Sequence, residues 1–571
     1  KRVGKVSVPF SLTLPTVHVP APDILQPLAG GLPRTWGQGP PRGTTPPPST
    51  GADYATPALQ LEQAIVPHIP YGGVFAIDVT PIRGPQIAER RSFGVEADSA
   101  IWTGHYLAAE AFRYAATNDP AALERLKFVL AGVQRLFDVT QDAVVRRNAA
   151  GARKRSAVQI TGIFARAALQ VTDKVTAGPL SARDCYYEAP EGGWDVTPRI
   201  GKTQHFAKYR DIPSSLLRGA TVTPVGTVWY GFGCGHVGGP DKDHPVSRDQ
   251  YSGIVMGLGY ARALVSDPDV QRITGELIEK ALHHLVIEGQ WNVILPPEGR
   301  IPVGSTFLGN QEKQLAFLLI GRSVNPAKYG PLYDQVKAAA SLVWLPVWMS
   351  LADPIPKYYK FNLEHAGGVV PALVFETDPG RRAAYMVAYD MLRKATRHHK
   401  NAYFNLARIL IEPPARRPVV AQEPSGSNPA ITLAQEIRSL LSEYLERRTL
   451  LIGTGTGTGL PRNQIADPGF QVGVWPGDVA LYTSLNLQEG GTGRSYEVRF
   501  AMPMKARIGN GIDFAWQRSP FGYALKPGSS TCGKPPTVEK VRTCGSAPRR
   551  EGPGVDYLLA YWLGRYLGVV P

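Results

Sequence analysis

The side chains most able to transfer protons or bind anions are concentrated in one glycine-rich segment, residues 231–253. An apolar pattern typical of a helix follows it directly, from Ile254 to Val265. Loops held by a rigid scaffold carry a large share of catalytic and binding residues. This segment therefore supplies most of the candidate catalytic residues, which are His236, Arg248, Asp249 and Tyr251. Gln250 is a candidate for binding the substrate.

Two aspartates each precede a helical pattern, Asp98 and Asp249. Two carboxyl groups at one end of a helical body would supply the general acid and general base that cleave a glycosidic bond. Their separation would then decide between inversion and retention at the anomeric carbon. Aspartate is also a favoured helix N-cap, so a purely structural role for both residues stays open.

The same segment also fits β-elimination from a uronate, which needs three groups. A cation or amide neutralises the carboxylate, and Arg248 or Gln250 suits that role. A base takes the C5 proton and an acid protonates the leaving oxygen, for which His236 and Tyr251 are the candidates. Core packing of Tyr251 is the structural alternative.

Aromatic and imidazole side chains near the polar motifs predict surfaces on which sugar rings stack, with core packing as the alternative. A second acid and imidazole pair, Glu364 and His365, follows a helical region. A C-terminal segment, 513–518, is placed to reach across a cavity mouth. The substrate-binding candidates from these patterns are Trp102, His105, Trp194, Trp229, His365, Trp516 and Arg518.

No cofactor is required by any of these schemes, although Asp241 and Asp243 have a spacing common in calcium loops. Four cysteines without a CxxC pair predict disulfides rather than a metal site. Cys532 and Cys544 flank a short loop and are predicted to pair, which leaves Cys185 for Cys234. Such bonds indicate an oxidising compartment.

The formal net charge of +15 over 571 residues favours anionic partners such as an acidic polysaccharide, with solubility alone as the alternative. No nucleic-acid motif is present, and the basic cluster at 146–155 is interpreted as a solvated loop. The chain begins at Lys1 without an apolar leader, which predicts a mature secreted, cell-surface or periplasmic protein. No apolar run is long enough to predict a transmembrane segment.

Three regions are expected along the chain. Residues 1–60 form an edge strand followed by a Pro/Gly-rich arm, residues 61–415 a helical body, and residues 416–571 a helix, a β-rich region and a final docking helix. Within the body, a helix, an Asp-Pro turn and a second helix occur twice, at Asp119-Pro120 and Asp267-Pro268. Helical hairpins in series predict a mainly α fold, an (α/α) toroid.

This layout resembles the six-hairpin class of carbohydrate-active enzymes. The resemblance covers roughly residues 95–415 and includes the motifs Asp98–Tyr106 and Ser247–Gly253. It implies a secreted enzyme that cleaves an acidic polysaccharide, as a glycoside hydrolase or a polysaccharide lyase. The alternative is a non-catalytic extracellular protein that self-assembles through the alternating apolar strand at residues 1–20.

Overall fold

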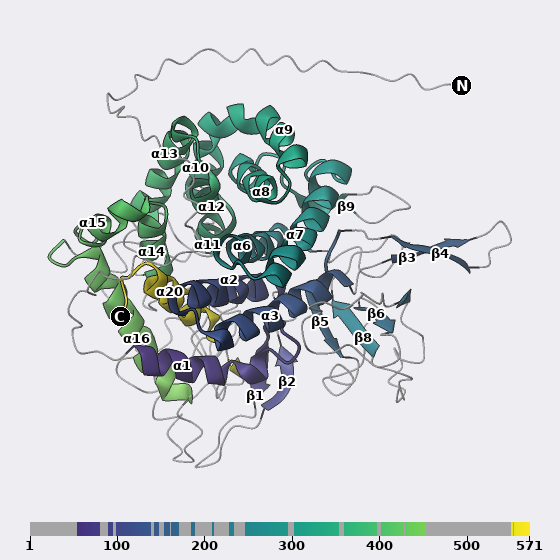
Figure 1. Cartoon of the computed structure of the whole chain (residues 1–571), viewed down its shortest axis with the longest axis horizontal. Coiled ribbons are helices and arrows are strands. Elements are labelled where there is room, and N and C mark those ends of the chain that lie inside the picture. The colour runs from purple at the N-terminus through teal and green to yellow at the C-terminus, as the bar shows by residue number, and fades with distance from the viewer. Residues whose placement is uncertain are drawn as a thin grey trace, which may run out of the picture.

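Helices make up most of the chain that the computed structural model describes (Figure 1). The prediction of a mainly helical protein is therefore confirmed. The described residues are 54–79, 90–94, 99–138, 142–147, 153–159, 162–170, 184–188, 208–210, 228–232, 246–294, 302–352, 359–396, 401–426, 429–452, 550–551 and 553–571.

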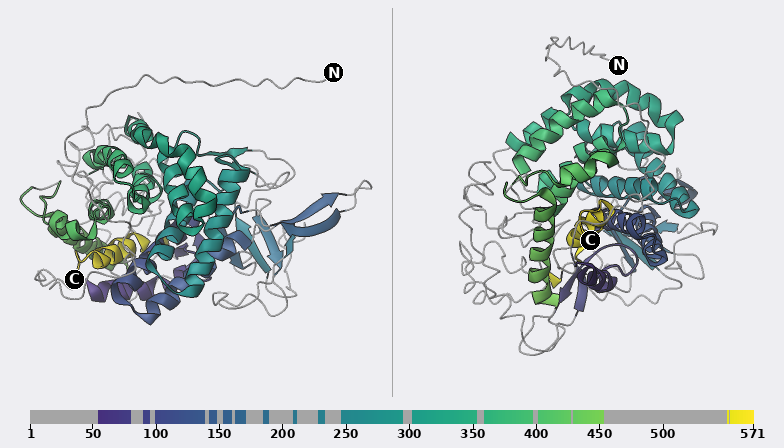
Figure 2. Two further views of the ribbon diagram at one scale, coloured as in Figure 1. Left: turned by 45° about the horizontal axis from the view of Figure 1, so that its top comes forward. Right: turned by 60° about the vertical axis from the view of Figure 1, so that its left-hand side comes forward.

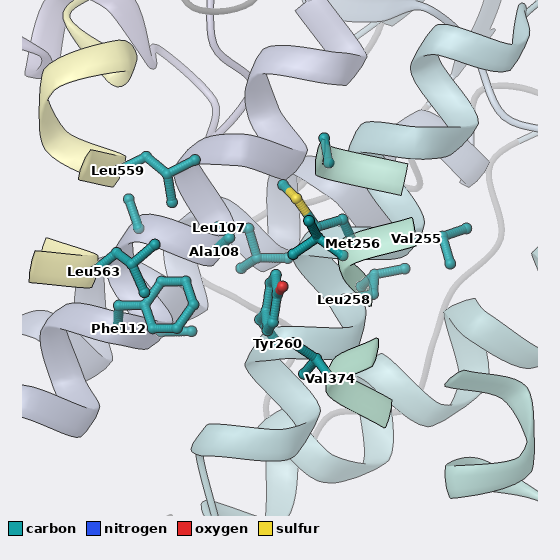
Figure 3. Close-up of a cluster of buried hydrophobic side chains, with 14 of the residues drawn as sticks. Leu107, Ala108, Phe112, Val255, Met256, Leu258, Tyr260, Val374, Leu559 and Leu563 are labelled. Atoms are coloured by element: carbon teal, nitrogen blue, oxygen red, sulfur yellow. The ribbon is translucent and has the colours of Figure 1, made fainter. Parts of the chain in front are cut away.

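The central helices of the described body contact one another in a closed succession. In order of contact they are α2 (Ser99–Thr117), α6 (Arg248–Leu264), α8 (Gln311–Val324), α12 (Val369–Phe375), α11 (Tyr359–Gly367), α14 (Ala402–Leu410) and α20 (Val555–Tyr566), and α20 contacts α2 again. Every residue of α2 from Ser99 to Arg113 is buried, as expected of a helix enclosed by others. Figure 3 shows the shared apolar core, in which the rings of Phe112 and Tyr260 lie 5.0 Å apart.

A second set of helices packs outside the central set (Figures 1 and 2). The outer helices are α3 (Pro120–Asp138), α7 (Pro268–Leu282), α9 (Pro326–Val336), α13 (Pro379–Thr396), α16 (Leu433–Ile452) and α1 (Ala55–Ala64). They pack on α2, α6, α8, α12, α14 and α20 respectively. Each outer helix makes most of its contacts to the central set with one helix, although α7 also contacts α8 and α16 also contacts α20.

The same short turn joins inner to outer helix in four of these pairs. Each outer helix begins with proline, and an Asp or Asn immediately before it caps the helix. The capping carboxylate or amide oxygen accepts a backbone N–H two or three residues later, which satisfies donors that the first turn leaves free. The four turns are Asp119-Pro120, Asp267-Pro268, Asn325-Pro326 and Asp378-Pro379.

The first turns of α2, α6, α8 and α12 lie at one end of the body, together with the last turn of α11, where a Cβ at Gly367 would overlap Ser252 Cβ. Gly253 of α6 packs against α2, because a Cβ there would lie 2.6 Å from the Ile101 carbonyl oxygen. The starts of α6 and α8 are joined by Arg248, whose Nη1 donates to Asn310 Oδ1 at 2.9 Å. The long connections from outer to inner helices enter at this end, which we call the N-terminal end of the central helices.

The described strands form small antiparallel sheets beside the helices. One sheet joins the two ends of the described chain, since β1 (Ala76–Val79) pairs with both β2 (Arg90–Gly94) and β11 (Arg550–Glu551). Two further pairs are β3 (Asp142–Arg147) with β4 (Arg153–Gln159) and β9 (Asn292–Ile294) with β10 (Pro302–Thr306). The largest sheet has the order β5 (Ala167–Gln170), β8 (Val228–Phe232), β6 (Asp184–Glu188) and β7 (Lys208–Arg210).

Two expectations from the sequence meet the structure at these elements. The basic cluster at 146–155, interpreted as a loop, instead belongs largely to paired strands β3 and β4. Among the described residues, no helix combines the length and the apolar character that crossing a membrane requires. The strand expected at residues 1–20 and the β-rich segment around 470–508 lie outside the described residues.

The remaining short helical elements connect these pairs. A π-helical turn, η4 (His283–Glu288), extends α7, and η5 (Lys337–Leu342) with α10 (Trp344–Ala352) leads from α9 toward α11. The shortest pieces are η1 (Val66–His68), η6 (Pro414–Arg416) and α15 (Arg417–Ala421).

Candidate functional site

Three buried charged side chains meet at the N-terminal end of the central helices. Lys313 of α8 donates from Nζ to Glu312 Oε1 at 2.7 Å and to Glu364 Oε1 of α11 at 2.6 Å. Glu312 is fully buried, and Lys313 and Glu364 are 4% and 3% exposed. One ammonium group thus holds two carboxyl groups from different helices, and we call these three residues the carboxyl cluster.

The local sequence explains how these side chains come together. Glu312 and Lys313 lie in the first turn of α8, and Glu364 lies within α11. Gly368, which follows α11, leaves space for both acids. A Cβ at that position would lie 2.6 Å from Glu364 Oε2 and 3.2 Å from Glu312 Cγ. Any side chain there would therefore displace at least one carboxyl group.

Burial and neighbouring charges shift the pKa values of Glu312 and Lys313 in the carboxyl cluster. Burial raises the pKa of Glu312 to about 7, and the Glu364 charge adds to that rise while Lys313 opposes it. Burial disfavours the charge on Lys313, but Glu312 and Glu364 outweigh it and raise the Lys313 pKa. The lysine therefore stays charged at neutral pH, where Glu312 holds its proton in a large share of molecules.

Each acid also presents a second oxygen. Oε2 of Glu312 and Oε2 of Glu364 have no hydrogen-bond partner among the described residues. Buried carboxyl oxygens are costly to leave without a partner, so sites that hold them are often sites of chemistry. The cluster can donate a proton from one carboxyl and accept one at the other.

Two of the residues predicted from the sequence lie at the same helix ends. Arg248 is exposed and bonds Asn310, two residues before Glu312. Asp249 is partly exposed in the first turn of α6. Arg248 and Asp249 therefore lie at the same end of the body as the carboxyl cluster, of which the sequence had singled out Glu364 alone.

Two other predicted residues are inside the core. Tyr251 is fully buried, with ring centroids 4.7 Å from Phe164 and 5.8 Å from Phe307. Gln250 is fully buried and caps α6, because its Oε1 accepts the Ser247 N–H at 2.8 Å. Burial, with a smaller effect of a nearby glutamate, raises the Tyr251 pKa above its ordinary value. In this position Tyr251 is a core residue, as the alternative interpretation held.

The remaining described candidates are also buried. Trp102 is 3% exposed on α2. His105 and His365 are fully buried, and each places Nδ1 2.6 Å from the carbonyl oxygen four residues earlier. Burial lowers the pKa of His105 to about 4 and that of His365 to about 3, so both rings are neutral at pH 7. His365 stacks on Phe404 with centroids 3.9 Å apart.

Two further candidates lie on strands of the largest sheet. Trp229 belongs to β8 and Cys185 to β6, where Cys185 stands opposite Gly231. Among the described residues, no group of three or more His, Cys, Asp or Glu side chains could hold a metal ion. The candidates outside the described residues are Asp98, Trp194, Cys234, His236, Asp241, Asp243, Trp516, Arg518, Cys532 and Cys544.

Comparison with known proteins adds no relative, because no protein-family model, curated protein or solved structure matches this chain.

Proposed function

We propose that this protein is a glycan-cleaving enzyme, a glycoside hydrolase, with Glu312 as general acid and Glu364 as the second carboxylate. One observation carries the proposal: a single lysine holds two carboxyl groups, one of which has a pKa raised to about 7. Glycosidases need such a pair, one acid protonated and one ionised, at the same pH.

The arrangement of helices supports an (α/α) toroid as the scaffold. Central helices contact in a closed succession, and outer helices pack on them in pairs. The sixth pair joins α1 and α20, so the first and last described helices complete the succession. In such a toroid the long connections gather at one end, and the carboxyl cluster lies at that end. The catalytic site would then lie at loops that the rigid ring of helices holds in position.

The chemistry assigns one step to each carboxyl group. Glu312 donates its proton to the glycosidic oxygen as the bond from that oxygen to the anomeric carbon breaks. Glu364 takes a proton from water, and the water oxygen bonds to the anomeric carbon. Lys313 stays bonded to both carboxyl groups throughout. Direct attack by Glu364 on the anomeric carbon, followed by hydrolysis, is the retaining version of the same scheme.

Hydrolysis fits the described residues better than β-elimination. Elimination needs a cation or amide that neutralises a uronate carboxylate, but Arg248 donates to Asn310 and Gln250 caps α6. It also needs a base such as Tyr251, which is buried among aromatic rings with its pKa raised. The described candidates for a lyase are therefore already committed to structural contacts.

Substrate has to reach side chains that are buried in the free protein. The segment from Leu308 to Asn310 leads into α8, and Leu308 is 58% exposed. Gly309 has a positive φ of 83°, and nothing lies within 4 Å of where its Cβ would be. We propose that this segment moves aside when the glycan binds.

Substitution of each acid tests the proposal. We expect Glu312→Gln and Glu364→Gln to fold normally and to lose about 10²–10⁴-fold in turnover, the usual contribution of acid–base groups. Reducing ends released from a panel of neutral and acidic polysaccharides measure this. Glu276→Gln, on the outer surface of α7 and 40% exposed, is the matched control and should keep full activity. Full turnover by Glu312→Gln on a polysaccharide that the wild type cleaves would remove the proposal.

A further inference from the structure

The paired strands β3 and β4 form a ribbon with an unusual charge pattern. Their register places Arg146 opposite Lys154, Arg147 opposite Arg153, and Val145 opposite Arg155. Directly opposed residues in an antiparallel pair have side chains on the same face, and like charges placed so repel. The register therefore sets two successive pairs of cations opposite each other.

The ribbon contains little neutralising charge of its own. From Asp142 to Gln159 it has five basic residues and one acid, Asp142, a formal charge of +4, and Asp142 pairs with Gln159 rather than with a cation. A two-stranded ribbon is only marginally stable by itself, so this repulsion is a real cost. A bound polyanion would offset that cost, because it would release counterions held near the cations and pair with them.

The ribbon is attached at the end of the body that holds the carboxyl cluster. The segment before β5 is fixed there by backbone bonds, from Ala165 N to Leu136 O at 2.9 Å and from Ala100 N to Arg166 O at 2.8 Å. Ala100 opens α2, and Leu136 closes α3. β5 then joins the four-stranded sheet, whose edge strand β7 contacts β3. Figures 1 and 2 show the ribbon extending from this sheet away from the helices.

The composition of the ribbon distinguishes between polyanions. No aromatic residue occurs from Asp142 to Gln159. Proteins that bind single-stranded nucleic acid combine basic residues with aromatic platforms on which bases stack. An acidic polysaccharide needs only the cations, because its charges lie on carboxylate or sulfate groups along the chain.

From this register, charge and attachment, we propose that the β3–β4 ribbon is a docking arm for an acidic polysaccharide. It rests on the proposed function, since the arm would deliver the polymer to the end of the body where the carboxyl cluster lies. It makes an acidic polysaccharide, carrying carboxylate or sulfate groups, the substrate class.

Two variants of equal net charge test the arm, each made in the full chain carrying Glu312→Gln so that the polymer is not cleaved. Glu312→Gln raises the formal charge from +15 to +16, and four further substitutions to glutamine lower it to +12 in both. In the ribbon variant the positions are Arg146, Arg147, Arg153 and Lys154. In the control they are exposed or half-exposed residues on the helical body, Arg272, Lys337, Lys394 and Arg416.

Binding is measured against polygalacturonate, neutral dextran and single-stranded DNA at several salt concentrations. We expect the Kd for polygalacturonate to rise about 10-fold or more in the ribbon variant, with a shallower dependence on salt. The control should change it by no more than about 2-fold, and dextran should show no difference between the variants.

Three results would overturn the inference. Equal losses in ribbon variant and control would mean that only total charge matters. An unchanged Kd in the ribbon variant would show that the ribbon does not bind the polymer. The proposed function would still hold if cleavage depends on Glu312. Tighter binding of DNA than of polygalacturonate at the same salt would assign the ribbon to nucleic acid. Cleavage that does not depend on Glu312 would remove the proposed function without affecting the binding result.

Discussion

Lys313 is the residue that makes two nearby acids chemically different. Two carboxyl groups in a buried site cannot both ionise cheaply, and one shared ammonium compensates for a single negative charge. Glu364 comes from a different helix, so the pair exists only in the folded protein. The result is a raised pKa for Glu312 beside a second carboxyl group bonded to the same ammonium.

The raised pKa of Glu312 predicts how stability depends on pH. The folded protein binds the Glu312 proton up to about pH 7, whereas the unfolded chain releases it near 4.5. The native state therefore holds more protons in this window, and the Glu312 contribution falls as pH rises from about 4.5 to 7, by at most about 1.4 kcal/mol per pH unit. The lowered pKa values of His105 and His365 act in the opposite direction below pH 6.5.

A difference measurement isolates the effect of Glu312. Urea unfolding of the wild type and of Glu312→Gln at pH 5, 6 and 7 should show the wild type losing stability relative to the variant as pH rises. The histidines cancel because both proteins contain them. A stability difference that stays constant across this range would show that Glu312 has an ordinary pKa.

Sequence patterns at the scale of single residues singled out Glu364 beside His365, and Arg248 and Asp249 at the same end of the body, but not Glu312 or Lys313. Asp249 and Arg248 stood out because polar groups crowd around them. Glu312 and Lys313 looked like an ordinary charged first turn, and nothing local indicates that α11 and Gly368 bury them. Burial by a segment about fifty residues away is a long-range contact, which periodicity does not encode.

At the scale of elements, the Asx-Pro turn is the device that sets where each outer helix begins. The turns at Asp119 and Asp267 were recognisable from the sequence, and their helices form as predicted. Those at Asn325 and Asp378 use the same chemistry but were not recognised as repeats. The order of the pairs was predictable from such turns, whereas the closing contact between α20 and α2 was not.

The turn at Asp267 offers a test of this device. Its Oδ1 accepts from the Asp269 and Val270 N–H groups, and its Oδ2 pairs with Lys127 of α3 at 2.8 Å. We expect Asp267→Ala to lower the free energy of unfolding by about 1–2 kcal/mol, the range for losing an N-cap. Asp267→Asn keeps the capping oxygen and should lose less than about 1 kcal/mol, the range for a partly exposed ion pair. Equal losses in the two variants by urea unfolding would contradict the capping role.

At the scale of the whole molecule, the first and last described helices are joined to α2 through one buried acid. Glu62 of α1 accepts from Tyr106 of α2 and from Trp562 Nε1 of α20, both at 2.6 Å. Arg113 lies 3.7 Å from the same carboxylate, with its guanidinium 5.4 Å from the Trp562 ring centre. Three helices far apart in sequence thus share one hydrogen-bond network, and its integrity should determine whether the succession of central helices closes.

A double-mutant cycle tests this junction. Trp562→Phe removes one donor from a buried carboxylate, which should cost about 1–3 kcal/mol. Combined with Glu62→Gln it should cost measurably less than the sum of the two single changes, because the shared contact is lost only once. Strict additivity in urea unfolding would mean that Glu62 does not couple α20 to α1.

The central claim is that Glu312 delivers the proton in glycan cleavage, and the most direct measurement compares leaving groups. Polysaccharide needs an acid, whereas an aryl glycoside with an acidic phenol leaves without one. We expect kcat/KM of the wild type on polysaccharide to fall as pH rises through about 7. Glu312→Gln should lose that activity but keep most of its turnover on the aryl glycoside. Equal losses on both substrates, or a wild-type profile unchanged through pH 7, would contradict the assignment.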